Sequence, residues 1–451
     1  MSVVVTQSRG TLRPLARLVW PVLAEQLLVM LVGFSDTLLA GHYLGPQHLA
    51  AMTMISYVLW LFTNLFSFVA IGAVAMTARF VGAQDWLQAN RVVNQSYVLG
   101  AILAAAFTTV GLLAGNHLAG ALQLHGESET LATRYLYYLI AVMPLMMCES
   151  VGIGCLRGAG DMVTGLFSMI MVNTVNIALS WSLLLGVGPL PEMGWDGLAI
   201  GTSCGHFVGG MIPLVVLLRG RSGLRIERRL LRPDPNLMRR ILRIGVPGGV
   251  DTLSITSCQL VFLSMIDRLG TVAAAAHGVA IRVESLAYLP GYAFQLAAAT
   301  LAGQYLGARD YRQARRSVLT ACAVSGTMLC GVALLFYLQA PLLVDWFLGP
   351  DQDDVAAVAP QLLRIIAIAL PALGLMQVLT GALRGAGDTR WPLAFTFVGF
   401  LVVRLPLAWA LTQYWSFGVQ GAWLAMAADV IVRCLLIVAR FLTGGWRRVE
   451  V

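Results

Sequence analysis

The sequence contains the octapeptide CLRGAGDM at residues 155–162 and repeats it almost unchanged as ALRGAGDT at residues 382–389. Other short matches have a similar spacing of 225 to 227 residues, among them Leu44-Gly45 with Leu269-Gly270. The chain is therefore two copies of one unit, each about half of its length. In a membrane protein such a duplication indicates transport, because substrate sites tend to lie between the two repeats.

The amino-acid composition indicates a membrane protein. Of the 451 residues, 58% are hydrophobic and only 12% are charged, against about 25% charged in a soluble domain. Apolar runs of about 20 residues cross the hydrocarbon as helices, which satisfy their own backbone hydrogen bonds, and these runs alternate too weakly for barrel strands. We expect the first run to be a retained span and not a cleaved signal peptide. The predicted fold class is an all-α integral membrane protein with twelve transmembrane helices, at approximately 15–40, 50–75, 92–115, 134–155, 163–187, 195–218, 241–266, 277–302, 317–340, 360–382, 391–413 and 419–442.

The placement of charge predicts the orientation. All 30 basic residues are arginine, and they concentrate in the even-numbered connections and beside the termini. By the positive-inside rule both termini are cytoplasmic, and an even number of spans per unit makes the two repeats parallel. The arginines then face anionic lipid headgroups. A nucleic-acid partner is not expected, since no aromatic stacking platform accompanies them.

The chain has one clear linker, the stretch 219–240, which holds eight arginines and two prolines. We therefore predict an N-terminal six-helix lobe over 1–218, an arginine-rich cytoplasmic linker over 219–240 and a C-terminal six-helix lobe over 241–451. The expected location is a bacterial cytoplasmic (inner) membrane, with a multi-pass monomer surrounded by membrane lipid.

Two carboxylates lie inside the first span, where an ionisable residue is costly and points to function. Glu25 and Asp36 are eleven residues apart, which places them on one helix face about 16 Å apart in depth. A buried carboxylate without a fixed counter-charge can exchange a proton near neutral pH; the alternative is a carboxylate that caps or is hydrated at the outer end. The repeat pairs Glu25 with Asp251 but Asp36 with Phe262, which favours an ion site confined to the N-terminal lobe.

Further polar residues lie in the fifth and sixth spans. Asn173, Asn176 and Ser180 share one helix face, and Thr202 lies in the next span. Their amides and hydroxyls can hydrogen-bond a carboxylate or coordinate a small cation, or else bond neighbouring spans to one another.

In the C-terminal lobe, Arg404 and Asp429 each lie near the middle of a span. We expect them to form a structural ion pair in preference to a substrate contact, with Arg433 as an alternative partner for Asp429. The lone histidines, His206 and His277, are expected to be satisfied core residues.

The glycine-rich LRGAGD loops lack the GK[ST] of a phosphate-binding loop, so no ATP site is expected. We expect these loops to make tight cytoplasmic turns, with Asp161 and Asp388 capping the following helices. Transport must then be driven by an ion gradient or by the gradient of the substrate itself.

These features together carry a resemblance. The doubled LRGAGD loops, the first span with Pro21 and Phe34-Ser35-Asp36-Thr37, and the segments Ala276-His277-Gly278 and Gly303-Gln304-Tyr305 resemble the multidrug and toxic compound extrusion (MATE) family over essentially the whole chain. The resemblance implies a V-shaped transporter of two six-helix lobes. It also implies cation-coupled antiport that exports bulky, amphipathic, often cationic compounds.

Within the family the chain is more similar to the DinF-like branch than to the NorM-like branch, since its seventh and tenth spans lack acidic residues at the NorM-like positions. The DinF-like pattern implies a coupling site at Asp36, Asn176 and Thr202, with an aspartate expected where Ser180 stands. Losing that charge weakens sodium binding, because a hard cation favours more than one carboxylate, and so favours protons. The coupling-site candidates are Asp36, Asn176, Ser180 and Thr202; the candidate cavity or gating residues are Glu25, Asn64, Asn173, Asp251, Thr256, Gln377, Arg404 and Asp429.

The predicted function is therefore cation-coupled multidrug efflux of small amphipathic substrates, with no cofactor beyond the coupling ion, H+ or Na+. The alternative is a lipid-linked precursor flippase of the same superfamily, which needs a strongly cationic cavity. A membrane enzyme is disfavoured, because no HExxH, GxSxG or paired histidines occur, and neither catalytic nor metal-ligating residues are predicted.

Overall fold

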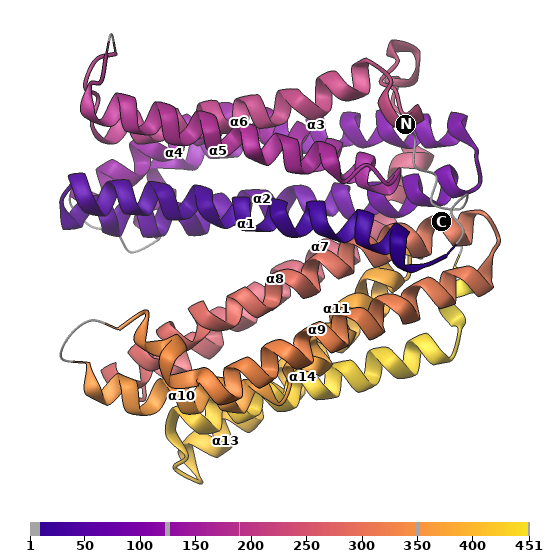
Figure 1. Ribbon diagram of the computed structural model, residues 1–451. Helices are drawn as coiled ribbons and strands as arrows, with labels where there is room; N and C mark the ends of the chain where they lie inside the picture. Colours follow the sequence, from indigo (N-terminus) through magenta and orange to yellow (C-terminus); the bar gives the residue numbers. More distant parts are fainter. Residues whose placement is uncertain (1–9, 122–126, 189, 349–351, 450–451) are drawn as a thin grey trace. The chain divides into compact units, whose positions relative to one another are not determined.

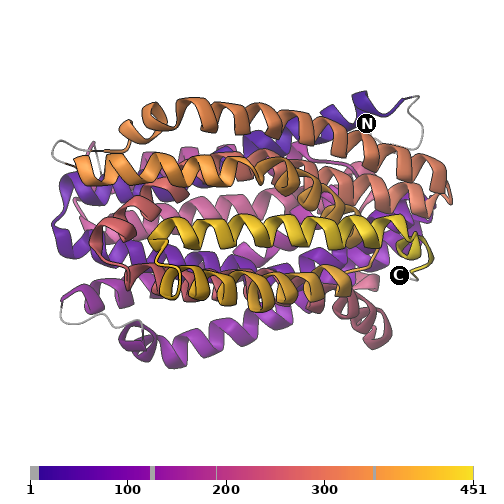
Figure 2. The same cartoon turned by 90° about the horizontal axis from the view of Figure 1, so that it is seen from below.

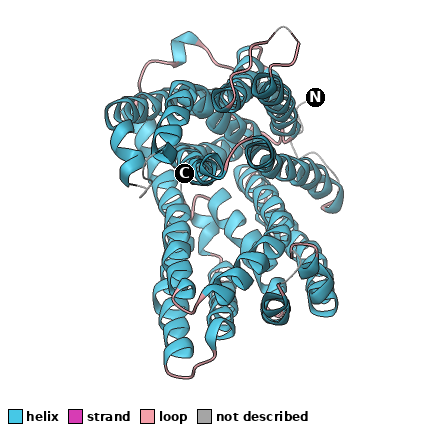
Figure 3. Cartoon of the chain, turned by 90° about the vertical axis from the view of Figure 1, so that its left-hand side faces the viewer, coloured by secondary structure: helices cyan, strands magenta, loops and turns pink. Residues whose placement is uncertain are grey.

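The computed structural model describes residues 10–121, 127–188, 190–348 and 352–449, and within these ranges all regular structure is helical (Figure 3). Eleven helices are long and apolar enough to cross a membrane, and one bent pair supplies a twelfth span. The predicted all-α membrane class is therefore confirmed. The helices are α1 Leu12–Tyr43, α2 Pro46–Gly82, α3 Trp86–Ala121, α4 Glu127–Gly158, α5 Val163–Leu185, α6 Trp195–Leu218, α7 Pro235–Asp267, α8 Thr271–Gly307, α9 Tyr311–Asp345, α10 Asp353–Ala367, α11 Leu370–Gly385, α12 Arg390–Phe397, α13 Leu405–Gln413 and α14 Gly418–Leu442.

The described chain divides into two compact units (Figure 1). Unit 1 holds residues 20–246, and unit 2 holds residues 10–19 together with 247–449. Both boundaries lie beside a proline, Pro21 in α1 and Pro247 in α7, where the helix lacks a backbone N–H. The lobe limits 1–218 and 241–451 with the linker 219–240 stay a prediction, and their ends at 1–9 and 450–451 lie outside the described residues.

Unit 1 is built on a close helix pair, α5 with α6, and on the trio α2, α4 and α6. Glycine makes the α5–α6 approach possible: a Cβ on Gly201 would lie 2.2 Å from Ser180 Oγ, and one on Gly197 would lie 2.7 Å from the Leu183 carbonyl carbon. At depth, α1 is joined to α5 and α6 by side-chain hydrogen bonds.

Unit 2 packs α8 against α9 and α11, and sets α14 beside a broken span (Figure 2). The sequence predicted spans over 360–382 and 391–413; the first is broken between α10 and α11, whereas the second is one helical span that contains a π-helical segment. Helices α10 and α11 meet at a bend of 51°, because Pro371 in the first turn of α11 has no N–H to continue the ladder. The second span consists of α12, the π-helical segment η4 (Val398–Arg404) and α13, whose second residue is Pro406.

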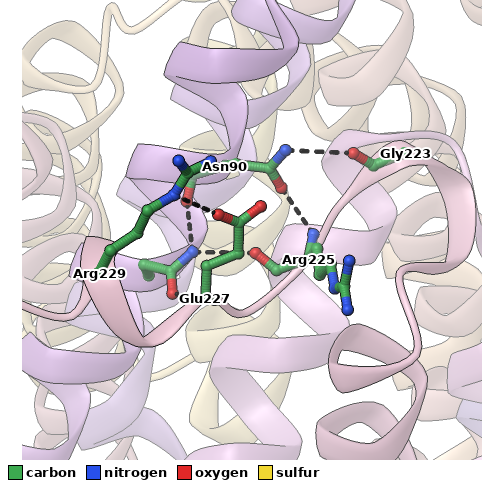
Figure 4. A network of polar contacts seen from close by, with 6 residues as sticks. Asn90, Gly223, Arg225, Glu227 and Arg229 are labelled. Carbon is green, nitrogen blue, oxygen red and sulfur yellow. Dashed lines mark hydrogen bonds and ion pairs between the residues drawn. The ribbon is translucent and has the colours of Figure 1, made fainter.

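The arginine-rich stretch 219–240 is held against α3 by three amide side chains. The Asn90 side chain accepts from the Arg225 backbone N–H at 2.6 Å and donates to the Gly223 carbonyl at 3.3 Å (Figure 4). Asn94 and Gln95 make equivalent bonds with residues 225–234. Because carbonyls and N–H groups of a non-helical segment need partners, these amides give the stretch a defined path within unit 1.

Each LRGAGD motif makes a tight turn, as predicted, because its second glycine has a positive φ: 88° at Gly160 and 87° at Gly387. Asp161 caps α5, since its Oδ1 accepts the Thr164 backbone N–H at 3.1 Å. At Asp388 the structure shows an ion pair, since Arg440 Nη2 lies 2.8 Å from Asp388 Oδ2; capping by Asp388 stays a prediction.

Candidate functional site

The Asp36 carboxylate is buried in unit 1 among neutral donors. Its side chain is 4% exposed. Asn176 Nδ2 of α5 donates to Asp36 Oδ1 at 3.1 Å, and Thr202 Oγ1 of α6 donates to Asp36 Oδ2 at 2.7 Å. The structure therefore brings three of the four coupling-site candidates together around one carboxylate, which bonds no arginine or histidine among the described residues.

The fourth candidate and two further hydroxyls complete the network. Ser180 Oγ lies 3.5 Å from Asn176 Nδ2, one turn along α5. The Tyr135 hydroxyl of α4 lies 2.8 Å from Thr202 Oγ1, and Ser35 Oγ donates to Asn176 Oδ1 at 3.2 Å. The two serine hydroxyls and the Tyr135 hydroxyl thus fix the orientation of the two groups that bond Asp36.

A cluster of buried apolar side chains packs against one side of this network. Tyr135, Trp195 and Leu198 belong to a buried cluster that also includes Ala40 of α1 and Met52 of α2. A polar pocket with apolar walls strengthens each interaction inside it, because the local dielectric constant is low. The site is thus a place where a change in the charge of one carboxyl has a large energetic effect.

The carboxylates that the repeat pairs occupy matching ion pairs. Arg157 Nη2 lies 2.5 Å from Glu25 Oε1 in unit 1, and Arg384 Nη2 lies 2.6 Å from Asp251 Oδ2 in unit 2. Each arginine is the one in its unit's LRGAGD motif. The motif therefore ends a helix and also supplies the counter-charge for the first carboxylate of its unit.

The other polar candidates bond mainly to backbone or pack against it. Asn64 Nδ2 donates to the Trp60 carbonyl at 2.9 Å and Thr256 Oγ1 to the Thr252 carbonyl at 3.2 Å, both within one helix. Asn173 Nδ2 donates to the Leu28 carbonyl of α1 at 3.0 Å. Gln377 is buried so tightly against α8 that a Cβ on Gly291 would lie 1.7 Å from its Oε1.

Unit 2 holds a buried charge cluster. Arg404 Nη2 and Arg433 Nη2 lie 2.8 Å and 2.7 Å from Asp429 Oδ2, and the three residues are 3%, 7% and 0% exposed. Arg404 also stacks over the rings of Phe400 and Phe262, at 4.4 Å and 5.5 Å from their centroids. The predicted Arg404–Asp429 pair and its alternative with Arg433 therefore both form.

Comparison with known proteins assigns the family. The MatE family model matches residues 21–182 and 247–410, one segment in each half of the repeat. The chain belongs to the MatE family.

Relatives of this MatE chain cover almost its whole length. The "Probable multidrug resistance protein NorM" of Thermotoga maritima is 29% identical over 449 residues, with 97% of this chain and 93% of that protein covered. The "Multidrug resistance protein NorM" of Burkholderia vietnamiensis is 27% identical, with 94% and 92% covered. Membership places the chain among multi-pass transport proteins.

Solved structures support the two-lobe MatE fold. A MATE protein in complex with MaL6 superposes with a TM-score of 0.92 at 22% identity, covering all of both chains. A transporter of the MOP superfamily from Pyrococcus furiosus, described as having a binding pocket of reverse polarity, gives a TM-score of 0.90 at 22% identity, with 100% and 99% covered. At this identity the likeness bears on the fold alone.

Two polar residues of this MatE protein were not predicted from its sequence to belong to the site. Tyr135 gives no signal there, because a tyrosine in an apolar run is ordinarily core or lipid-facing. Glu149 did give one, since it is an acid inside the fourth apolar run. Its Oε2 lies 3.1 Å from His206 Nδ1, whereas His277, which accepts from Trp423 Nε1 at 3.1 Å, is the core histidine that we expected.

Proposed function

We propose that this MatE protein is a proton-coupled antiporter that exports amphipathic, often cationic compounds, with a DinF-like coupling site at Asp36. The observation that carries the proposal is the buried Asp36 carboxylate held by neutral partners, Asn176 and Thr202. A charged partner would hold the carboxylate ionised, whereas amide and hydroxyl donors leave protonation accessible.

Protonation changes how α1 is held. Hydrogen bonds to a carboxylate are roughly twice as strong as those between neutral groups, so a proton on Asp36 weakens the bonds from Asn176 and Thr202. Helix α1 depends on such bonds at this depth, while α5 and α6 stay packed through Gly201. Proton uptake from outside then lets α1 shift or bend, the lobe cavity contracts and substrate leaves outward. Deprotonation toward the cytoplasm resets the lobes.

The ligand set favours H+ over Na+. A hard cation favours several oxygen ligands and more than one carboxylate. Here Asp36 is the one carboxylate in the described network, and Asn176 directs its amide NH2 toward it. Ser180 contributes a hydroxyl where a second acid would complete a sodium site.

The first test is Asp36→Asn in reconstituted vesicles. An asparagine keeps the size of the side chain but cannot carry a proton between the two sides. We expect substrate efflux driven by a pH gradient to be lost in Asp36→Asn and retained in Thr37→Ala, whose hydroxyl bonds the Gly33 carbonyl of its own helix. Proton-driven efflux that survives Asp36→Asn would disprove the assignment.

The second test adds the missing acid. We expect Ser180→Asp to make transport depend on Na+, because the variant has two carboxylates within reach of one cation. Transport rates are measured with an imposed Na+ gradient at equal pH on both sides, in wild type and variant. A wild type that already responds to Na+ alone would contradict proton coupling.

A flippase for lipid-linked precursors is the alternative function. Its pyrophosphate headgroup would need deep cations that are free of acidic partners, but the buried Arg404 and Arg433 of unit 2 bond Asp429. This partial neutralisation argues for the antiporter. We further propose a monomer in the bacterial inner membrane with cytoplasmic termini, as the arginine placement indicates.

A further inference from the structure

Unit 1 buries a second acid–base pair, between Glu149 of α4 and His206 of α6. Their side chains are 8% and 11% exposed, and His206 Nδ1 lies 3.1 Å from Glu149 Oε2. His206 is four residues beyond Thr202, hence on the same face of α6 and about 6 Å further along the helix. The pair therefore begins one helical turn from the group that bonds Asp36.

The pair also interacts electrostatically with the two carboxylates of α1. Glu149 and Glu25 lie within electrostatic reach of one another, as do His206 and Asp36. Glu25 is bonded to Arg157 beside the LRGAGD turn. Ionisable groups thus follow one another from Asp36, through His206 and Glu149, to Glu25 and Arg157.

Unpartnered polar atoms run along the same line. His206 Nε2, Glu149 Oε1 and Glu25 Oε2 are buried without a hydrogen-bond partner among the described residues. Ser203 Oγ and Asn173 Oδ1 share this property. Buried polar atoms are ordinarily bonded, and each exception calls for an explanation. A file of carboxyl, imidazole and hydroxyl groups that can pass on a proton explains the unpartnered atoms of His206, Glu149, Glu25 and Ser203.

Packing alone does not require the pair. Replacing a buried ion pair by apolar residues of similar volume is often neutral or stabilising, and unit 2 shows such a replacement. By the 227-residue spacing of the LRGAGD motifs, Met376 stands where unit 1 has Glu149, and it is buried. The acid–base pair is thus confined to the unit that contains Asp36.

We propose that the Glu149–His206 pair is the relay through which a proton leaves Asp36 toward the cytoplasm, an inference that rests on the proposed proton coupling. The O–H bond of the Asp36 carboxyl breaks and an N–H bond forms at His206 Nε2, with one hydroxyl or water bridging the intervening turn. The ionised Glu149 balances the imidazolium. The Nδ1–H bond of the imidazolium then breaks and an O–H bond forms at Glu149 Oε2, the atom 3.1 Å away. Glu149 in turn gives up this proton toward Glu25 and returns to the carboxylate. The other titratable or charged groups around the pair are Asp36 and Glu25 from α1, Arg157 from α4 and Tyr97 from α3.

Two assays in proteoliposomes separate a relay from a structural role. The first measures net substrate transport driven by a pH gradient, with a trapped pH-sensitive dye to follow protons. The second measures substrate–substrate exchange at equal pH, which needs no proton release. The variants are His206→Gln and Glu149→Gln, and the matched control is His277→Gln, the buried histidine of unit 2.

We expect both variants to slow pH-driven transport by about a hundredfold, the low end of what a positioned acid–base group contributes, and to leave exchange within about twofold of wild type. The double variant should be no slower than either single variant, because residues that act as one unit have non-additive effects. His277→Gln should retain both activities.

Three results would overturn the relay. Wild-type coupling in both His206→Gln and Glu149→Gln contradicts it directly. Glu149→Gln keeps a side chain that can bond His206. If this variant loses exchange as much as it loses coupling, the pair has a structural role. A wild type that ignores a pH gradient refutes the proposed function and the relay together, whereas coupling lost only in Asp36→Asn refutes the relay alone.

Discussion

At corresponding positions, unit 1 joins an acid to an amide and unit 2 joins an aromatic ring to a guanidinium. Asp36 bonds Asn176 in unit 1, and Arg404 stacks over Phe262 in unit 2. Asp36 and Phe262 correspond by the spacing of the repeat. Asn176 and Arg404 correspond once one extra residue is allowed, and the π-helical segment η4 supplies that residue, since a π-turn holds one residue more than an α-turn.

The two repeat units share one helical scaffold but use their buried polar residues differently. In unit 1 the carboxylate has neutral partners, so its charge can change during a transport cycle. In unit 2 the charges of Arg404 and Arg433 are permanent and both bond Asp429, so the cluster holds α14 against η4. Duplication supplied two similar helical scaffolds. Sequence divergence then left a carboxylate that can change its charge in unit 1 and a fixed ion-pair cluster in unit 2.

The strongest test of this comparison removes Asp429. Asp429→Leu leaves two buried arginines unpaired, which should destabilise the protein by about 3–5 kcal/mol. Asp36→Asn, which strands no opposite charge, should change stability far less. Thermal unfolding in detergent measures both. Replacing Arg404, Asp429 and Arg433 together by apolar residues should restore stability, and a triple variant as unstable as Asp429→Leu would show that the cluster does more than balance its own charge.

A smaller effect should follow from Gly201→Ala. The added Cβ would lie 2.2 Å from Ser180 Oγ and 2.7 Å from the Ser180 backbone nitrogen, so α5 and α6 must separate at a cost of about 1–3 kcal/mol. Ala425→Gly, at a buried alanine of α14 in unit 2, serves as the control. The melting temperatures of the two variants, each compared with wild type, measure this loss of stability. Equal melting temperatures for Gly201→Ala and wild type would contradict the close α5–α6 contact.

The smallest effect is expected for Tyr135→Phe. The variant loses one hydrogen bond to Thr202, worth about 0.5–1.5 kcal/mol, and keeps the aromatic packing beside Trp195. Because Thr202 then donates to Asp36 with less constraint, the pH at half-maximal transport should shift while maximal transport persists. Transport measured over a range of pH gives this value. An unchanged pH profile would place Tyr135 in packing alone.

Much of this arrangement could be predicted from the residues. Asp36, Asn176 and Thr202 were recognisable as polar groups in apolar runs, and the LRGAGD repeat revealed which acids correspond. Tyr135 was not recognisable, since its hydroxyl is significant only beside Thr202. The Arg157–Glu25 pair was also missed, because 132 residues separate its members and the repeat relates each one only to its counterpart in the other unit.

By itself, the sequence determined that this protein is a duplicated bundle of membrane-spanning helices in which the second repeat lacks the acid Asp36, because hydrophobic run length, charge placement and repeat spacing are properties of the chain alone. Only the tertiary structure decided which polar groups satisfy one another. Hydrogen bonds and ion pairs act over about 3 Å, a distance set by how helices rotate and approach. That packing made Asp36 a carboxyl among neutral donors, placed Glu149 against His206, and joined Arg404 and Arg433 to Asp429.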